Sequence, residues 1–192
     1  MKQILIINGH PNPSSLCNSL ANEYENSVRR NPEFKVERLN LSDLQFDPIM
    51  RFGYQTKQDL EPALITAQNL IKSADHLVFV YPNWWGSMPA LLKGFIDRVF
   101  LPGFAFKYRD NPIPEKLLKS KTSELLVTLD TPIWYFKFFM NSRGTKIMVH
   151  SILGFCGIRN KRVTYFSPIR GSTEDQRKKY LEKARLLGST LP

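Results

Sequence analysis

Five short apolar or alternating runs, separated by helical patterns, restrict the fold of this chain more than any other feature of its sequence. The runs at 3–8 and 76–82 are apolar almost throughout, as expected for strands buried on both faces. The expected strands are 3–8, 34–41, 76–82, 122–130 and 161–168. The expected helices are 16–30, 62–73, 89–100, 142–156 and 173–188, with the aromatic run 134–139 left unassigned. This alternation predicts a doubly wound α/β fold with a mostly parallel sheet.

The length and composition favour one folded domain. The chain has 192 residues, of which 42% are hydrophobic and 23% charged, so we expect a single domain over 1–192. The first residues, MKQILIINGHP, lack the apolar core of a signal peptide, and no apolar run approaches membrane-spanning length. A cytoplasmic protein without membrane insertion is therefore expected.

The cysteines and the charge argue against a metal site and against nucleic-acid binding. Cys17 and Cys156 lie outside any metal-binding spacing, which favours two buried thiols in a reducing compartment and no metal. The formal charge of +10 attracts anions such as nucleic acid or a phosphate-bearing ligand. The clusters 159–162 and 177–179 are short, and we expect the second on the outer face of its helix. Without a nucleic-acid-binding motif, a solvated basic surface is favoured over nucleic-acid binding.

The loop after the first strand resembles an anion site. In NGHPNPSSLCNS, residues 8–19, Gly9 permits a tight turn, and Ser15 and Asn18 offer polar side chains where the helix begins. Backbone N–H groups at a helix start bind phosphates, and His10 is a candidate donor. The loop lacks the Walker and GxGxxG patterns. A capping loop without a ligand is the alternative.

The loops after the third and fourth strands add flat aromatic faces. In YPNWWGSMP, prolines stiffen both ends and Gly86 allows a close backbone approach, while Asn83, Trp84 and Trp85 offer amides and planar surfaces. An isoalloxazine ring requires that combination, although tryptophans at a surface or an interface are the alternative. After the fourth strand, the candidates for the other ring edge are Asp130, Thr131 and Trp134. We expect Phe136, Phe138 and Phe139 to pack in a cluster.

These motifs resemble the flavodoxin-like NAD(P)H:quinone oxidoreductases, the family that includes DT-diaphorase and bacterial modulators of drug activity. The resemblance covers nearly the whole chain and rests on HPNPSS, YPNWWGSMPALLKGFIDRVF with PGFAFKY after it, and ILGFCG. It implies a five-stranded sheet in the order 2-1-3-4-5, with helices on both faces. It also implies a cytoplasmic homodimer in which NAD(P)H and a quinone-like acceptor react in turn at a flavin.

The resemblance also implies roles for individual residues. The implied flavin-binding residues are His10, Ser15, Leu16, Cys17, Asn18, Pro82, Asn83, Trp84, Trp85, Gly86, Asp130 and Thr131. The implied acceptor pocket consists of Phe106, Tyr108 and Trp134, with the first two reaching over the partner's flavin.

The chain departs from the family pattern in two loops. The resemblance implies FAD. Leu16 and Cys17 replace the Phe and Asn of a Ser-Phe-Asn motif, which keeps FMN open as the alternative. A Thr-Gly-Gly turn is replaced by LDTPIW, which leaves Tyr135 as the nearest candidate for a charge-relay residue. An ancillary subunit of a potassium efflux transporter, built on the same fold, is the alternative function.

Overall fold

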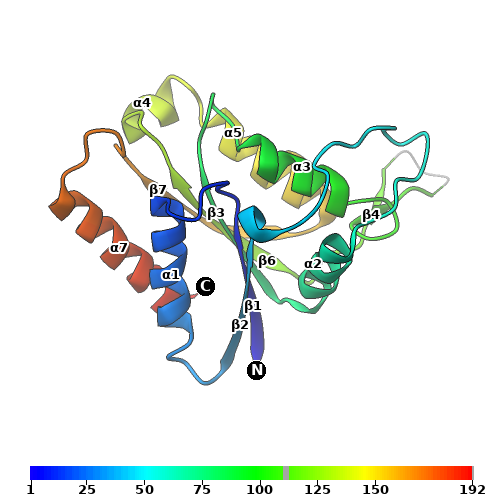
Figure 1. The fold of residues 1–192 in the computed structure, drawn as a ribbon, viewed down its shortest axis with the longest axis horizontal. Helices are drawn as coiled ribbons and strands as arrows, with labels where there is room; N and C mark the ends of the chain where they lie inside the picture. Colours follow the sequence, from blue (N-terminus) through cyan, green and yellow to red (C-terminus); the bar gives the residue numbers. More distant parts are fainter. Residues whose placement is uncertain (110–112, 192) are drawn as a thin grey trace.

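A computed structural model describes residues 1–109 and 113–191 and contains a five-stranded parallel sheet (Figure 1). Its strands are β1 (Lys2–Asn8), β2 (Phe34–Asn40), β3 (His76–Pro82), β6 (Thr122–Thr128) and β7 (Arg159–Phe166). They stand in the order β2-β1-β3-β6-β7. The intervening labels belong to β4 (Phe106–Lys107) and β5 (Glu115–Lys116), which pair antiparallel in a separate small sheet. Taken in chain order, the five main strands therefore follow the expected succession.

The helices agree with the expected positions except in the segment after β6. The helices are α1 (Leu16–Val28), α2 (Pro62–Ser73), α3 (Ala90–Val99), α4 (Ile133–Phe138), α5 (Arg143–Lys146), α6 (Gly154–Cys156) and α7 (Glu174–Ser189). A short 3-10 turn, η1 (Leu41–Asp43), follows β2, and a π-helical segment, η2 (Ile147–Leu153), joins α5 to α6. The aromatic run without a prediction forms α4. Pro89 is the N-cap of α3 and not its first helical residue.

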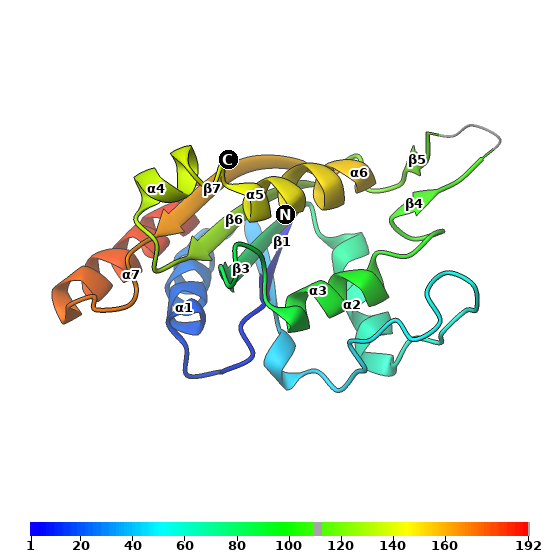
Figure 2. The same cartoon turned by 90° about the horizontal axis from the view of Figure 1, so that it is seen from above.

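The sheet is the middle layer of three because its strands bury both faces. Along β1, Ile4 and Ile6 pack in the core beneath α1 and α7, whereas Leu5 and Ile7 pack in the core beneath α2 and α3. Each fully buried aliphatic side chain contributes about 1.5–3 kcal/mol. Figures 1 and 2 show α1 and α7 side by side. The loops that leave the carboxyl ends of the strands are therefore held by buried strands.

A buried polar cluster lies beneath α1 and α7. Glu124 of β6 is fully buried, and its carboxylate accepts hydrogen bonds from the Tyr24 hydroxyl and from Arg162 Nε, the latter at 2.6 Å. His76 Nε2 lies 3.8 Å from the same carboxylate. Burial raises the pKa of Glu124, but the contacts with His76, Arg162 and Tyr24 outweigh it, so the pKa lies below its ordinary value. The cluster ties α1, β6 and β7 together.

A second buried cation holds the long irregular segment 44–61. Arg98 of α3 is 1% exposed and donates to the carbonyl oxygens of Asp47, at 2.6 Å, and Asp59, at 2.8 Å. It also pairs with Glu61 at 2.9 Å. The segment, which includes Tyr54, is thus fixed to α3 without a helix or strand of its own after η1.

Two further features bear on the class of protein: the state of the cysteines, and whether the chain has membrane-spanning helices or metal sites. Both cysteines are free and buried, as expected. Among the described residues no helix is long and apolar enough to cross a membrane, and no cluster of His, Cys, Asp or Glu suits a metal ion.

Candidate functional site

The loops after β1, β3 and β6 lie at one edge of the sheet (Figure 1). They line a cavity of about 290 Å³. The cavity is lined by His10, Asn12, Ser15, Leu16, Cys17, Pro82, Asn83, Trp84, Thr128, Leu129, Asp130, Ile169 and Arg177. A neighbouring hollow shares three of these residues and is lined by Asn83, Trp84, Trp85, Gly86, Asp130, Thr131 and Met140. The structure therefore brings together every predicted cofactor residue except Asn18.

The start of α1 presents free hydrogen-bond donors to this cavity. Ser15 is the N-cap, and its hydroxyl accepts from the backbone N–H of Asn18 at 3.3 Å. Within 1–109 and 113–191, no acceptor contacts the backbone N–H groups of Leu16 and Cys17. The helix is 13 residues long, so its amino terminus carries a partial positive charge. Both features suit a phosphate group.

His10 adds a neutral donor. The backbone N–H of Asn12 donates to His10 Nδ1 at 2.9 Å, so the proton of the neutral ring lies on Nε2. Burial lowers the pKa of His10, which favours this neutral form. The ring packs edge-on against Trp84, with centroids 5.4 Å apart. His10 therefore lies between the start of α1 and the Trp84 ring in the cavity wall.

Cys17 forms part of the cavity wall as a thiol. Its Sγ lies 3.4 Å from the hydroxyl of Thr128. Burial raises the pKa of Cys17 to about 12. The residue therefore stays protonated near neutral pH and is not a nucleophile.

The two tryptophans belong to a tight hairpin. Trp84 and Ser87 exchange backbone hydrogen bonds of 2.8 and 2.9 Å. The two residues between them, Trp85 and Gly86, have φ angles of 51° and 76°, the signs of a type I′ turn. Such a conformation is strained for a bulky residue by about 1–3 kcal/mol. Trp84 is half-exposed, and Trp85 is fully exposed at the tip.

The hairpin rests directly on α5. A Cβ placed on Gly144 would overlap the carbonyl oxygen of Gly86 and lie 2.8 Å from the Cα of Ser87. All of these neighbours are backbone atoms, which cannot turn aside. The absence of a side chain at Gly144 therefore sets the height of the hairpin above the helix.

The third loop is tied to the loop that follows β7. Asp130 Oδ1 accepts from the backbone N–H of Arg170 at 2.7 Å. The hydroxyl of Ser167 donates to the carbonyl oxygen of Thr131 at 2.6 Å. These bonds orient the loop along the edge of the cavity.

Arg177 is a site residue that sequence reasoning missed. The cluster 177–179 is exposed on α7, as expected, but Arg177 also lines the cavity, and its Nε donates to Ser172 at 3.0 Å. A capping box between Thr173 and Gln176 fixes the rotation of the helix. The cavity also gains Asn12, Thr128, Leu129 and Ile169. The position of Arg177 in the first turn of α7, directly after the predicted capping box, could have indicated that it lies near the cavity.

Asn18 and the aromatic run lie elsewhere than expected. The carboxamide oxygen of Asn18 contacts Asn8 and Arg38, and the residue lines neither hollow. Phe136 is buried as expected. Phe139 packs in an aromatic cluster with Trp134 and Tyr135 but is 69% exposed, whereas the expectation that Phe138 packs was wrong, since it is 81% exposed. On the same helix, Tyr135 stacks on Phe139 at 5.0 Å, and Trp134 is 58% exposed.

Phe106 and Tyr108 line a second cavity of about 260 Å³ that shares no residue with the first. Tyr54, Phe155 and Cys156 are also in its wall. Phe106 is 6% exposed and packs against Phe155 at 4.9 Å, whereas Tyr108 is 61% exposed. Trp134 is not in this wall, so the three predicted acceptor residues do not meet within one chain.

The fold and the site define a class: a doubly wound α/β protein with a cavity at the carboxyl ends of its parallel strands, the position at which such folds bind ligands. The model of the Flavodoxin-like fold family matches residues 2–187. The chain belongs to the flavodoxin-like NAD(P)H:quinone oxidoreductase family.

Individual relatives agree with this assignment. An uncharacterized NAD(P)H oxidoreductase from Haemophilus influenzae is 30% identical over 94% of this chain and 91% of its own length. An FMN-dependent NADH:quinone oxidoreductase from Macrococcus caseolyticus is 30% identical over 56% of this chain and 60% of its own length. The crystal structure of Smu.1420 from Streptococcus mutans superposes with a TM-score of 0.85 at 33% identity, covering 97% of this chain and 98% of that one.

Proposed function

We propose that this chain is a flavin-dependent NAD(P)H oxidoreductase that reduces quinones or similar acceptors, with residues 1–192 forming one flavin-binding domain. One observation carries the proposal. A single cavity presents free backbone donors of α1 and the neutral His10 toward one ligand group, and the half-exposed Trp84 toward another. A flavin has matching parts: an anionic phosphate and a flat ring. The names of the relatives describe the same chemistry.

The cavity residues fit the two parts of a flavin. The backbone donors of Leu16 and Cys17, together with His10 and Arg177, would hold the phosphate end. The ring would lie against the Trp84 hairpin, with Asp130 at its other edge. A bound flavin supplies hydride transfer from NAD(P)H and onward reduction of the acceptor, each substrate reacting in turn. The other proposed cofactor contacts are Ser15, Leu16, Pro82, Asn83, Trp85, Gly86 and Thr131. Tyr135 stays a candidate for charge relay.

The choice between flavins is part of the proposal. The family resemblance suggests FAD, whereas the relative from Macrococcus caseolyticus is named for FMN. The replacement of the motif positions by Leu16 and Cys17 leaves room for either. The two free, buried thiols are in keeping with a reducing compartment, and we place the protein in the cytoplasm.

We also propose that the active unit is a homodimer. Trp85 lines the hollow beside the first site and is fully exposed, and Phe138 and Phe139 are exposed at the end of α4. The exposed Tyr108 borders the separate second cavity. A second copy that brought Tyr108 and Trp134 together would complete the acceptor pocket. Sedimentation equilibrium should then give twice the mass of 22.2 kDa, and a monomer with full activity would contradict this assembly.

The first expected result is a flavin spectrum that responds to NADPH. The purified protein, reconstituted with FAD and separately with FMN, should retain one flavin, bleach when NADPH is added without oxygen, and recover its colour with a quinone. Trp85→Ala should weaken flavin retention, because the hairpin loses an exposed ring face. Retained flavin that stays oxidised with NADPH and NADH would contradict the oxidoreductase, and failure to bind either flavin would contradict the site.

A further inference from the structure

A chain of amide groups connects the cofactor loop to strand β2. Asn8, the last residue of β1, is fully buried. Its Nδ2 donates to the carboxamide oxygens of Asn18, at 3.3 Å, and Asn40, at 3.4 Å. Its Oδ1 accepts from the backbone N–H of His10 at 3.3 Å. The side chain of Asn8 therefore holds the first turn of the loop that carries the His10 ring.

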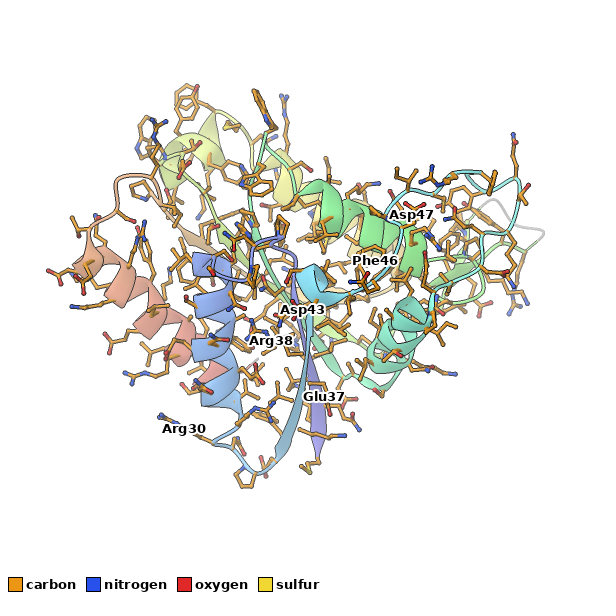
Figure 3. The ribbon with its side chains drawn as sticks, in the orientation of Figure 1. Arg30, Glu37, Arg38, Asp43, Phe46 and Asp47 are labelled. Atoms are coloured by element: carbon orange, nitrogen blue, oxygen red, sulfur yellow. The ribbon has the colours of Figure 1, made fainter. Side chains whose placement is uncertain are left out.

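Arg38 lies at the other end of this chain of amides. Its side chain extends from β2 toward α1 and is only 11% exposed (Figure 3). Its Nε donates to Asn40 Oδ1 at 2.8 Å, and its Nη2 donates to Asn18 Oδ1. The same two oxygens therefore receive hydrogen bonds from both Arg38 and Asn8.

The chemistry of arginine gives this network a direction. A guanidinium has only donors, so the asparagines that accept from it, Asn18, Asn22 and Asn40, must present their oxygens. Asn8, which faces the oxygens of Asn18 and Asn40, must present its NH₂ group, and its own oxygen must then face His10. Asn40 is also oriented by Asp43, to which its Nδ2 donates at 3.1 Å. A carboxamide in the place of Arg38 would therefore release Asn18, whose NH₂ group could then face Asn8 and favour the orientation of Asn8 that sets an NH₂ group against the N–H of His10.

We propose that Arg38 is a positioning residue that fixes the orientation of these amides and thereby the place of His10 in the phosphate end of the cavity. Arg38 does not line the cavity, so it acts through Asn8, Asn18 and Asn40. The ring of His10 then accepts from Asn12 at Nδ1, which leaves Nε2–H as its remaining donor. The role of that donor toward a phosphate rests on the proposed function, whereas the orientation of the ring does not.

The chain offers a matched control for the charge of Arg38. Arg38 also pairs with Glu25 at 3.3 Å, and Arg29 pairs with the same carboxylate at 2.6 Å. Arg29 has no contact with the asparagines. Arg29→Met removes one cation from Glu25 and leaves the amide network intact, so it separates loss of charge from loss of orientation.

The test compares Arg38→Met, Arg38→Gln, Arg38→Lys and Arg29→Met by imidazole ¹⁵N NMR without cofactor and by flavin titration. Wild type, Arg29→Met and the donor-only Arg38→Lys should show the Nε2–H tautomer of His10. Arg38→Met and Arg38→Gln should show mixed tautomers and bind flavin roughly tenfold more weakly, about the effect of one hydrogen bond. In a His10→Ala background, Arg38→Met should cause no further loss of affinity.

Two results would overturn the proposal. One is an unchanged His10 tautomer in Arg38→Gln and Arg38→Met, whether or not their thermal stability falls, since that is a purely structural role. The other is the same tautomer change in Arg29→Met. If Arg38→Met does not fold, the difference in His10 tautomer between Arg38→Lys and Arg38→Gln decides whether the proposal holds. If the wild type binds no flavin but the Arg38 variants show the predicted tautomer changes, the proposed function is rejected and the role of Arg38 is supported.

Discussion

Arg162→Met is expected to lower the free energy of unfolding by about 3–5 kcal/mol at pH 7, because it removes one partner of a buried ion pair. Glu124 is fully buried, and the polar partners left to its carboxylate within 1–109 and 113–191 would be the Tyr24 hydroxyl and the imidazole of His76. Arg162 also donates to the carbonyl oxygen of Leu187 at 3.0 Å, so the end of α7 loses a contact as well. Urea unfolding followed by circular dichroism measures the difference.

The pH dependence identifies Glu124 as the cause. Its pKa in the folded wild type is lowered, so its contribution to stability is complete above the unfolded pKa, about 4.3, and is lost as the pH falls through the folded pKa. Without Arg162, only the contacts with His76 and Tyr24 oppose the effect of burial, so we expect the pKa of Glu124 to be higher in the folded variant than in the folded wild type. The deficit of the variant should therefore shrink as the pH is lowered from 7 toward 4.5.

Two companion variants complete this test. Arg159→Met, an exposed arginine on the same strand, should change stability by less than about 0.5 kcal/mol. Adding Glu124→Leu to Arg162→Met should recover part of the loss, because no buried charge is left without a partner. A deficit under 1 kcal/mol, or one that stays constant between pH 7 and 4.5, would show that Glu124 is not held by Arg162.

Gly144→Ala should displace the hairpin of Trp84 and Trp85 and weaken flavin binding roughly tenfold to a hundredfold, since overpacking against backbone costs about 1–3 kcal/mol. The added methyl group would overlap the carbonyl oxygen of Gly86 and press on Ser87. Alanine favours a helix over glycine by about 1 kcal/mol, which does not relieve a clash with another segment. Flavin titration, with tryptophan fluorescence of the cofactor-free protein, measures the effect.

The matched variant for Gly144→Ala is Arg143→Ala. Arg143 lies in the same turn of α5 but is exposed, and its truncation adds no atom beneath the hairpin. It should retain wild-type flavin affinity and fluorescence. Wild-type affinity in Gly144→Ala would mean that the hairpin can rise without loss of the ring site, and that its height does not matter.

The sequence predicts this fold well because parallel strands buried on both faces leave an unambiguous pattern. The runs at 3–8 and 76–82 became β1 and β3 almost to the residue, and the loops after them contain the site. Doubly wound folds place ligands at strand ends, so locating the loops located the cavity.

The remaining site features depend on contacts between distant segments. Arg177 reaches the cavity because of the rotation of α7, and Gly144 matters because a loop 58 positions earlier, at Gly86, lies on it. Asn18 has the right type and place to donate to a phosphate, but its carboxamide contacts Arg38 and Asn8, and it does not line the cavity. Local patterns carry no information about such partners. Phe138 was misjudged because aromatic residues usually pack, and here it is exposed.

The close backbone contact between the hairpin and α5 has a consequence for motion. Because Gly86 rests on Gly144 without an intervening side chain, displacement of the hairpin removes the backbone packing of α5 at this contact. Local opening of the two segments should then be a single cooperative event, and a ligand that binds the closed form should slow it in both. Amide hydrogen exchange in Arg143–Lys146, none of which lines the cavity, should therefore slow when the cavity is filled.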